Sequence, residues 1–195
     1  MPRENTKALI LEVAGELLAS GGISAVSFDA IATRLGRSKQ AVLYWYPNKH
    51  ALLGAMFLPA LKAEAETATA ALAHCETEAE AIAAFVSSIL RFHMGDLDRF
   101  RMMYLLPQTQ RHAGGEPPAG ALLDEVHPVT DAMYAALAAR LGGDPISARQ
   151  KAFAIHSAVL GVALMFGLAD SLGDPLKHGA EEAARALIES FGASL

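Results

Sequence analysis

The sequence is almost without cysteine, because Cys75 is the single one in 195 residues. An intrachain disulfide is therefore excluded, and a reducing cytoplasm fits this composition. The opening residues, MPRENTK, contain no apolar run of the kind that forms a secretory signal. The uncharged apolar stretch at residues 158–169 is too short to span a bilayer, so we expect it in a buried helix. These absences predict a cytoplasmic protein that does not insert into membranes.

The chain also lacks a large excess of one charge, since its formal net charge is −5. The charges are unevenly placed, however. Residues 1–50 hold six lysines and arginines against four acidic residues, a net of +2, which leaves −7 for the remainder. A mildly basic head on an acidic body is compatible with one end that faces DNA, although the asymmetry is modest.

Strand patterns and tandem repeats are missing as well, and helical periodicity takes their place. About half of the residues are hydrophobic, as in a globular protein with a sizeable core. We therefore predict an all-α fold, with a loop at 107–120 that carries Gly-Gly and Pro-Pro pairs. The expected helices cover residues 6–19, 28–35, 39–45, 49–74, 76–94, 97–106, 121–141, 146–170 and 176–192.

Two short helices around Gly36 form a helix-turn-helix pattern. Ser27 can cap the first, over 28–35, and Ser38 can cap the second. The second helix would present Ser38, Lys39 and Gln40 at its N-terminal end, where such a helix enters the major groove. Glutamine can make a bidentate contact to adenine, and lysine can contact guanine. The pattern predicts a protein that reads DNA.

The first quarter of the chain resembles the DNA-binding region of the TetR family of bacterial regulators. The order and spacing of the motif agree at Ile31, Ala32, Gly36, Ser38, Lys39, the run Tyr44-Trp45-Tyr46-Pro47, Lys49, Leu52 and Leu53. The resemblance implies an N-terminal three-helix domain over residues 1–48. A larger helical domain over 49–195 would bind an effector and dimerise.

The resemblance also implies a role for each residue of the motif. Base edges would be faced by Lys39, Gln40 and Ala41, and the DNA backbone would be contacted by Ser27, Thr33, Trp45 and Lys49. Arg37 is an unusual basic residue beside the turn and would add a phosphate contact. Leu43 stands where the family usually has a tyrosine, so that contact is either absent or supplied by Tyr44. Tyr46 replaces the usual phenylalanine, and its ring can fill the same apolar slot.

Residues 49–195 resemble the family only in general plan. The segment 146–170 is hydrophobic nearly all round, so it needs burial on several sides, and a symmetric homodimer interface would cover one of them. Methionines, aromatics and histidines could line a pocket for a small, largely apolar effector. The candidate lining residues, any of which could instead be plain core, are Phe85, Ile89, Phe92, His93, Met102, Met103, Tyr104, Met133, Tyr134, Phe153 and His156.

Three other functions compete with a repressor that an effector releases from a palindromic operator. The histidines and acids pair only at helical spacings, and the sequence shows no zinc-protease or nucleophile motif, so we predict no metal site, no cofactor and no enzyme. Activation in place of repression stays open. A helical ligand-binding or protein-interaction module that has lost DNA affinity also stays open, because of Leu43.

Overall fold

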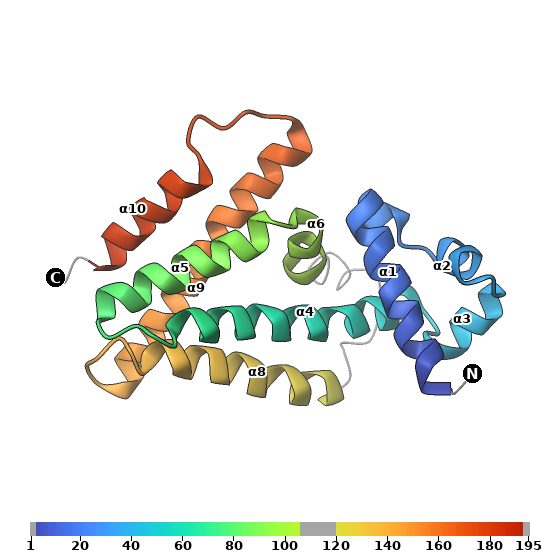
Figure 1. The fold of residues 1–195 in the computed structure, drawn as a ribbon, viewed down its shortest axis with the longest axis horizontal. Coiled ribbons are helices and arrows are strands. Elements are labelled where there is room, and N and C mark those ends of the chain that lie inside the picture. The colour runs from blue at the N-terminus through green and yellow to red at the C-terminus, as the bar shows by residue number, and fades with distance from the viewer. Residues whose placement is uncertain (1–2, 106–119, 193–195) are drawn as a thin grey trace. The chain divides into compact units, whose positions relative to one another are not determined.

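The computed structural model describes residues 3–105 and 120–192, and these ranges are helical with no β-strand (Figure 1). This confirms the all-α prediction. Apolar residues at helical spacing account for the result, because each helix buries one stripe of side chains against its neighbours. The predicted loop at 107–120 lies outside the described residues, apart from Gly120.

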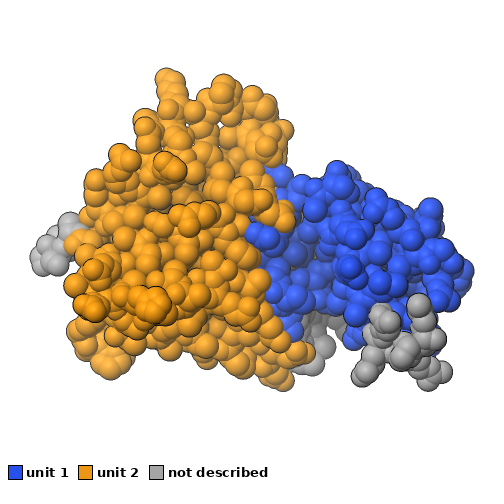
Figure 2. All heavy atoms as spheres, viewed as in Figure 1, with its two compact units in different colours: residues 1–60, 98–117 blue, residues 61–97, 118–195 orange. Residues whose placement is uncertain are grey.

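The chain divides into two compact units (Figure 2). Unit 1 comprises residues 1–60 and 98–117, and unit 2 comprises residues 61–97 and 118–195. The long helix α4, Lys49–Leu72, contributes residues to both units. The predicted domain boundary between residues 48 and 49 coincides with the start of this helix and stays a prediction.

Unit 1 is built on α1 (Arg3–Ala25), α2 (Phe28–Leu35) and α3 (Lys39–Trp45), with the first half of α4. The segment after Asp98 adds most of α6 (Leu97–Phe100) and the short π-helix η1 (Arg101–Leu105). One uninterrupted helix was expected over 97–106, so this prediction was too regular. The apolar core of the unit includes Ile10, Ala14, Val26, Ile31, Val42, Tyr46 and Leu52.

Regular helical geometry in α1 is interrupted at Gly21 and Gly22, two residues after the end of the helix expected over 6–19. Gly22 has φ +66°, a left-handed conformation that favours glycine. A side chain at this position would also meet the Asp98 carboxylate, whose Oδ1 would lie 3.3 Å from an added Cβ. The glycine pair therefore redirects the chain towards α2.

Unit 2 contains the second half of α4 together with α5 (Glu78–Met94), α8 (Gly120–Ala138), α9 (Pro145–Leu172) and α10 (Ala180–Gly192). Helix α9 packs against α5, α8 and α10, so it is central to the unit. Its start is fixed by Asp144, which directly precedes Pro145 and whose Oδ1 accepts from the N–H groups of Ile146 and Ser147. The fully buried side chains of this core include Ile82, Phe85, Ile89, Met133, Leu137 and Ile155.

Two helices of the described ranges, α1 over Thr6–Ala25 and α9, are long and apolar enough to cross a membrane by length and composition alone. The uncharged run at 158–169, which is too short by itself, is part of the longer α9. Core helices of globular proteins pass the same test, and Ile155, Val159 and Ala163 of α9 are fully buried within unit 2.

Candidate nucleic-acid interface and buried polar cluster

The turn between α2 and α3 is closed by backbone hydrogen bonds. Gly36 adopts φ +61°, and the Arg37 N–H donates to the Ala32 carbonyl at 2.9 Å. At the other end of α2, the Ser27 hydroxyl accepts from the Ala30 N–H at 3.1 Å. These contacts satisfy backbone groups that a short helix would otherwise leave without partners. The predicted capping of α2 by Ser27 is therefore present, and Gly36 lies in the predicted turn in a left-handed conformation.

Helix α3 separates an inner face from an outer one. Ser38 begins the helix by accepting from the Ala41 N–H at 3.3 Å. Val42 is 1% exposed and anchors the inner face, whereas Lys39 and Gln40 are exposed. The two predicted base readers therefore lie on the surface at the N-terminal end of α3, as a recognition helix requires.

An ion pair that the sequence analysis did not foresee holds the Lys39 side chain. Its Nζ lies 2.8 Å from Oδ2 of Asp29, in the first turn of α2. Both side chains are at least half exposed, so water and salt screen the pair. Lys39 is thereby positioned in the free protein, by an acid that would compete with any base or phosphate for its ammonium group.

The predicted backbone contacts are spread over the surface of unit 1. Arg37 and Tyr44 are exposed, the latter by 73%, and the Tyr44 ring packs edge-on against the half-buried Trp45 at 5.3 Å. The Thr33 hydroxyl donates to the Asp29 carbonyl at 2.8 Å. The exposed Lys49 donates to the Ile23 carbonyl at 3.3 Å.

The neighbouring Tyr46 is only 3% exposed and serves the core of unit 1, as expected for the apolar slot. Burial raises the pKa of its hydroxyl. Leu43, the departure from the family pattern, is half-buried.

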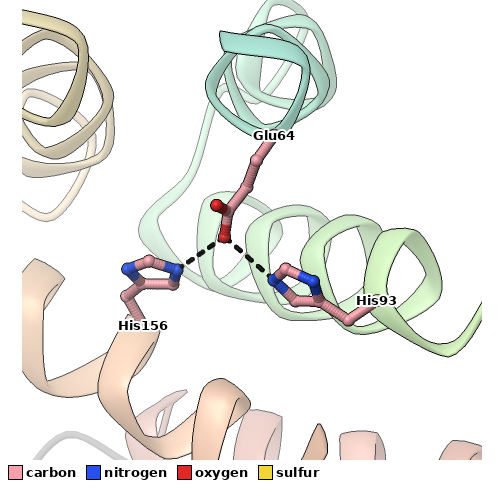
Figure 3. A group of neighbouring side chains, drawn as sticks. All are labelled: Glu64, His93 and His156. Atoms are coloured by element: carbon pink, nitrogen blue, oxygen red, sulfur yellow. Dashed lines mark hydrogen bonds and ion pairs between the residues drawn. The ribbon is translucent and has the colours of Figure 1, made fainter. Parts of the chain in front are cut away.

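A buried polar cluster lies inside unit 2 (Figure 3). Oε1 of Glu64 on α4 is 2.9 Å from Nε2 of His93 on α5 and 2.9 Å from Nε2 of His156 on α9. Glu64 and His93 are fully buried, and His156 is 3% exposed. Three helices therefore direct ionisable groups to one point of the interior, where each such group needs partners.

The cluster keeps the carboxylate of Glu64 ionised. Burial by itself raises the pKa of this group, but the hydrogen bonds with His156 and His93 outweigh it and lower the pKa to about 2. A buried anion is thus stabilised by two imidazole rings.

Tyr134 of α8 extends the cluster towards the surface. Its hydroxyl lies 2.8 Å from Nδ1 of His156, the ring nitrogen that faces away from Glu64. The pKa of Tyr134 is raised to about 12, first by burial and then by the negative charge of Glu64. The fully buried Phe85 packs edge-on against the His156 ring, with the ring centroids 5.9 Å apart.

The predicted effector-pocket residues are divided between the two units. Met102, Met103 and Tyr104 belong to unit 1, and the others belong to unit 2. Within unit 2, the hydrogen-bonded cluster unites His93, His156 and Tyr134, whereas Phe153 is 59% exposed on α9 and lies beside Tyr134. A contact of these residues with an effector stays a prediction.

The surface of unit 2 carries several grooves, of which two involve α4 or α5. One, of about 630 Å³, runs between α4 and α8 and is lined mainly by small side chains, with Lys62, Glu66 and Met133. The other, of about 440 Å³, lies between α5 and α10, with Arg91, Glu181 and Arg185 among its walls. Of the predicted pocket residues, only Met133 lines either groove.

Glu64 was missed by sequence reasoning, although a signal was present. It falls in the buried register of α4, with Leu61, Ala65, Ala68 and Leu72. An acidic residue on an apolar helical stripe indicates a buried, paired charge. The partners come from helices 29 and 92 residues further along the chain, so periodicity alone could not identify them.

Comparison with known proteins agrees with this geometry. The family described as bacterial regulatory proteins, tetR family, matches residues 10–56, which include α2, the turn and α3. A search of curated proteins by sequence gave no match.

Solved structures resemble the chain over nearly its whole length. The TetR-family regulator PfmR from Thermus thermophilus has a TM-score of 0.65 at 22% identity, with coverage of 93% of this chain and 96% of that one. The regulator FadR from Bacillus subtilis, solved with stearoyl-CoA, has a TM-score of 0.66 at 14% identity, covering 96% and 98%. TetR from Acinetobacter baumannii AYE has a TM-score of 0.66 at 20% identity, covering 98% and 94%. At these identities the likeness establishes the fold. The match over residues 10–56 shows in addition that this part of the chain is a region of the kind found in bacterial regulatory proteins of the tetR family.

Proposed function

We propose that this protein is a sequence-specific transcriptional repressor, which binds a palindromic operator in the bacterial cytoplasm as a homodimer and is released by a small effector. The observation that carries the proposal is the helix-turn-helix of α2 and α3 within the tetR-family match. Lys39 and Gln40 stand exposed at the N-terminal end of the second helix, which is where base readers belong.

The dimer is supported by an unpartnered apolar stripe on α9. Phe153, Leu164, Leu168 and Leu172 are between 41% and 71% exposed, and they recur at helical spacing along one side. Exposed apolar surface of this kind marks an interaction site, and a two-fold axis lets the same stripe cover itself. Two recognition helices related in this way would fit successive major grooves, about one DNA turn or somewhat more apart.

A small, largely apolar effector is supported by the neighbours of the fold. FadR was solved with stearoyl-CoA, and the related structure of EbrR is described as a multidrug binding protein. In this chain, the groove between α4 and α8 has mainly apolar walls. Effector binding would shift the population towards a spacing of the two heads that no longer fits the operator.

The first test is selection of bound genomic fragments with the wild type and with Gln40→Ala. The wild type should enrich a palindrome. The variant should lose preference at one position per half-site, at a cost of about 1–3 kcal/mol. The same motif at the same affinity would remove Gln40 from the base readers. No enrichment by the wild type would favour the alternative of an interaction module without DNA affinity.

The second test separates phosphate contacts from base contacts. Lys49→Ala should weaken all sequences alike and reduce the salt slope by roughly two units per dimer, one for each phosphate that the variant no longer neutralises. Lys62→Ala is the matched control, because Lys62 is an exposed lysine of the same helix but of unit 2. Equal slopes for the two variants would exclude Lys49 as a phosphate contact.

The third test concerns the dimer. Sedimentation of the wild type at micromolar concentration should give a dimer, and Leu168→Glu should shift it towards the monomer because a charge would be buried at the interface. Leu123→Glu on α8, where the leucine is 44% exposed, serves as the control and should stay dimeric. A monomeric wild type would overturn the dimer.

A further inference from the structure

Three side chains of types that can bind metal ions converge at the buried polar cluster of unit 2. We propose that Glu64, His93 and His156 bind a divalent first-row transition metal ion. One atom from each residue is available, and these three atoms lie within 4.8 Å of one another. They come from α4, α5 and α9, so the ion would tie three helices together (Figure 3).

The donor set matches this class of ion. Two imidazole nitrogens and one carboxylate oxygen suit zinc, iron or cobalt, whereas magnesium and calcium prefer oxygen ligands only. Three protein ligands leave at least one coordination position open, as in zinc sites that also bind a water or a small ligand. The site would therefore hold an ion that remains able to take a further ligand.

The geometry requires a modest adjustment. In a tetrahedral site with metal–ligand bonds of about 2.0–2.2 Å, neighbouring ligand atoms stand about 3.4 Å apart. The two imidazole nitrogens are now 2.9 Å from the carboxylate oxygen, which is a hydrogen-bonding distance. Rotations of the two imidazole rings that move their nitrogens by about an ångström would lengthen both contacts with Glu64. The same rotations would shorten the distance between the two nitrogens, which is at most 4.8 Å.

Tyr134 supplies the support that metal-binding histidines usually have. Its hydroxyl lies 2.8 Å from Nδ1 of His156, so this ring can donate Nδ1–H to the tyrosine oxygen while Nε2 turns its lone pair to the ion. Such an outer partner fixes the tautomer and the orientation of the ring. Tyr134 is itself half-buried, so the hydrogen-bonded chain reaches a partly exposed residue on this side, where an ion could enter.

Charge favours the ion as well. The carboxyl group of Glu64 is fully buried and is hydrogen-bonded to both imidazole rings. A dication among these groups would compensate the carboxylate directly, in an apolar surrounding that strengthens the attraction. Phe85 and Ile89, both fully buried, belong to that surrounding in α5.

The exposed pair of His178 and Glu182 provides a comparison with the buried cluster. His178 lies 3.4 Å from Glu182 across one helical turn, but both side chains are more than half exposed. A single exposed pair offers two flexible ligands and no buried third one, so it should not retain an ion. His178→Gln is therefore the matched control.

The test uses the full-length chain without a histidine tag, stripped of metal and then titrated with Zn²⁺ and with Co²⁺. We expect one ion per chain, and X-ray absorption of the zinc form should show imidazole nitrogens at about 2.0–2.1 Å. Tyr134→Phe should weaken binding about 10–100-fold. Glu64→Gln should weaken it further, and His178→Gln should leave the affinity unchanged.

Two results would overturn the proposal: wild-type affinity no greater than that of Glu64→Gln, or an absorption spectrum without imidazole ligation. The spectrum is measured on the wild type, so it decides the matter even if a variant fails to fold. No DNA is present in the experiment, so its outcome is independent of the proposed repressor function.

Discussion

The ion pair between Lys39 and Asp29 should restrain DNA binding. If Lys39 reads bases, its ammonium must leave the carboxylate 2.8 Å away before it reaches the groove. Asp29→Asn removes that competitor and preserves the shape of the side chain. It also removes a negative charge from the proposed DNA-binding surface, so operator affinity should rise.

The exposure of the pair sets the size of the effect. With side chains 50% and 71% exposed, the pair falls in the range of surface salt bridges, about 0.2–1 kcal/mol. Two heads per dimer give about 0.4–2 kcal/mol, which is roughly a 2- to 30-fold gain in affinity. The gain should shrink as salt is raised, because screening weakens the pair in the free protein.

Fluorescence anisotropy with the selected operator would measure this gain at two salt concentrations. Glu16→Gln is the matched control, because Glu16 forms a similarly exposed pair with Arg34, at 3.2 Å, in the same unit. In a Lys39→Ala background, Asp29→Asn should lose most of its effect, since the partner is gone. If Asp29→Asn bound the operator no more tightly than Glu16→Gln, the ion pair with Asp29 would not restrain DNA binding by Lys39.

The remaining predictions concern the stability of unit 2. Phe85→Ala should lower the free energy of unfolding by about 3–5 kcal/mol in urea denaturation, because the ring is fully buried; a loss under 1 kcal/mol would mean that the site collapses or is loosely packed. Thr77→Ala should cost about 1 kcal/mol, because the hydroxyl accepts from the Glu80 N–H at 3.2 Å in the capping box of α5, and an unchanged melting temperature would contradict this role. The backbone N–H groups of Glu76 and Thr77 lower the pKa of Glu80. Its stabilising effect should therefore be present above the ordinary pKa of a glutamate and be lost as pH falls through the lowered one. Melting curves of Glu80→Gln should differ most from the wild type at neutral pH, and a difference that grows in acid would have the wrong sign.

Local signals determined much of the N-terminal region. Serines at 27 and 38 cap α2 and α3, and Gly36 lies in the predicted turn between the two helices. These features depend on neighbours within four residues, so the sequence is sufficient to predict them. The helix expected from residue 49 does begin at Lys49, directly after Asn48, whose side chain accepts from the Ala51 N–H.

The sequence predicted one regular helix in a segment whose backbone conformation depends on tertiary packing. Residues 97–106 have enough apolar character for one helix, yet residues 97–105 form the short α6 and then the π-helix η1. Phe100, Met102 and Met103 are all buried there. A π-helical turn alters the angular spacing of side chains, which a pattern of 3.6 residues per turn does not describe.

The sequence by itself determined the fold class, the helix-turn-helix and the exposed end of α3, because each rests on short-range order along the chain. Only the tertiary structure decided that Lys39 pairs with Asp29 and that Glu64 meets His93 and His156. The last two contacts join residues 29 and 92 positions apart, and a buried charge is stable only where such distant helices bring its partners. Periodicity places a residue on a face of its helix, but it does not say which residue of another helix that face will meet.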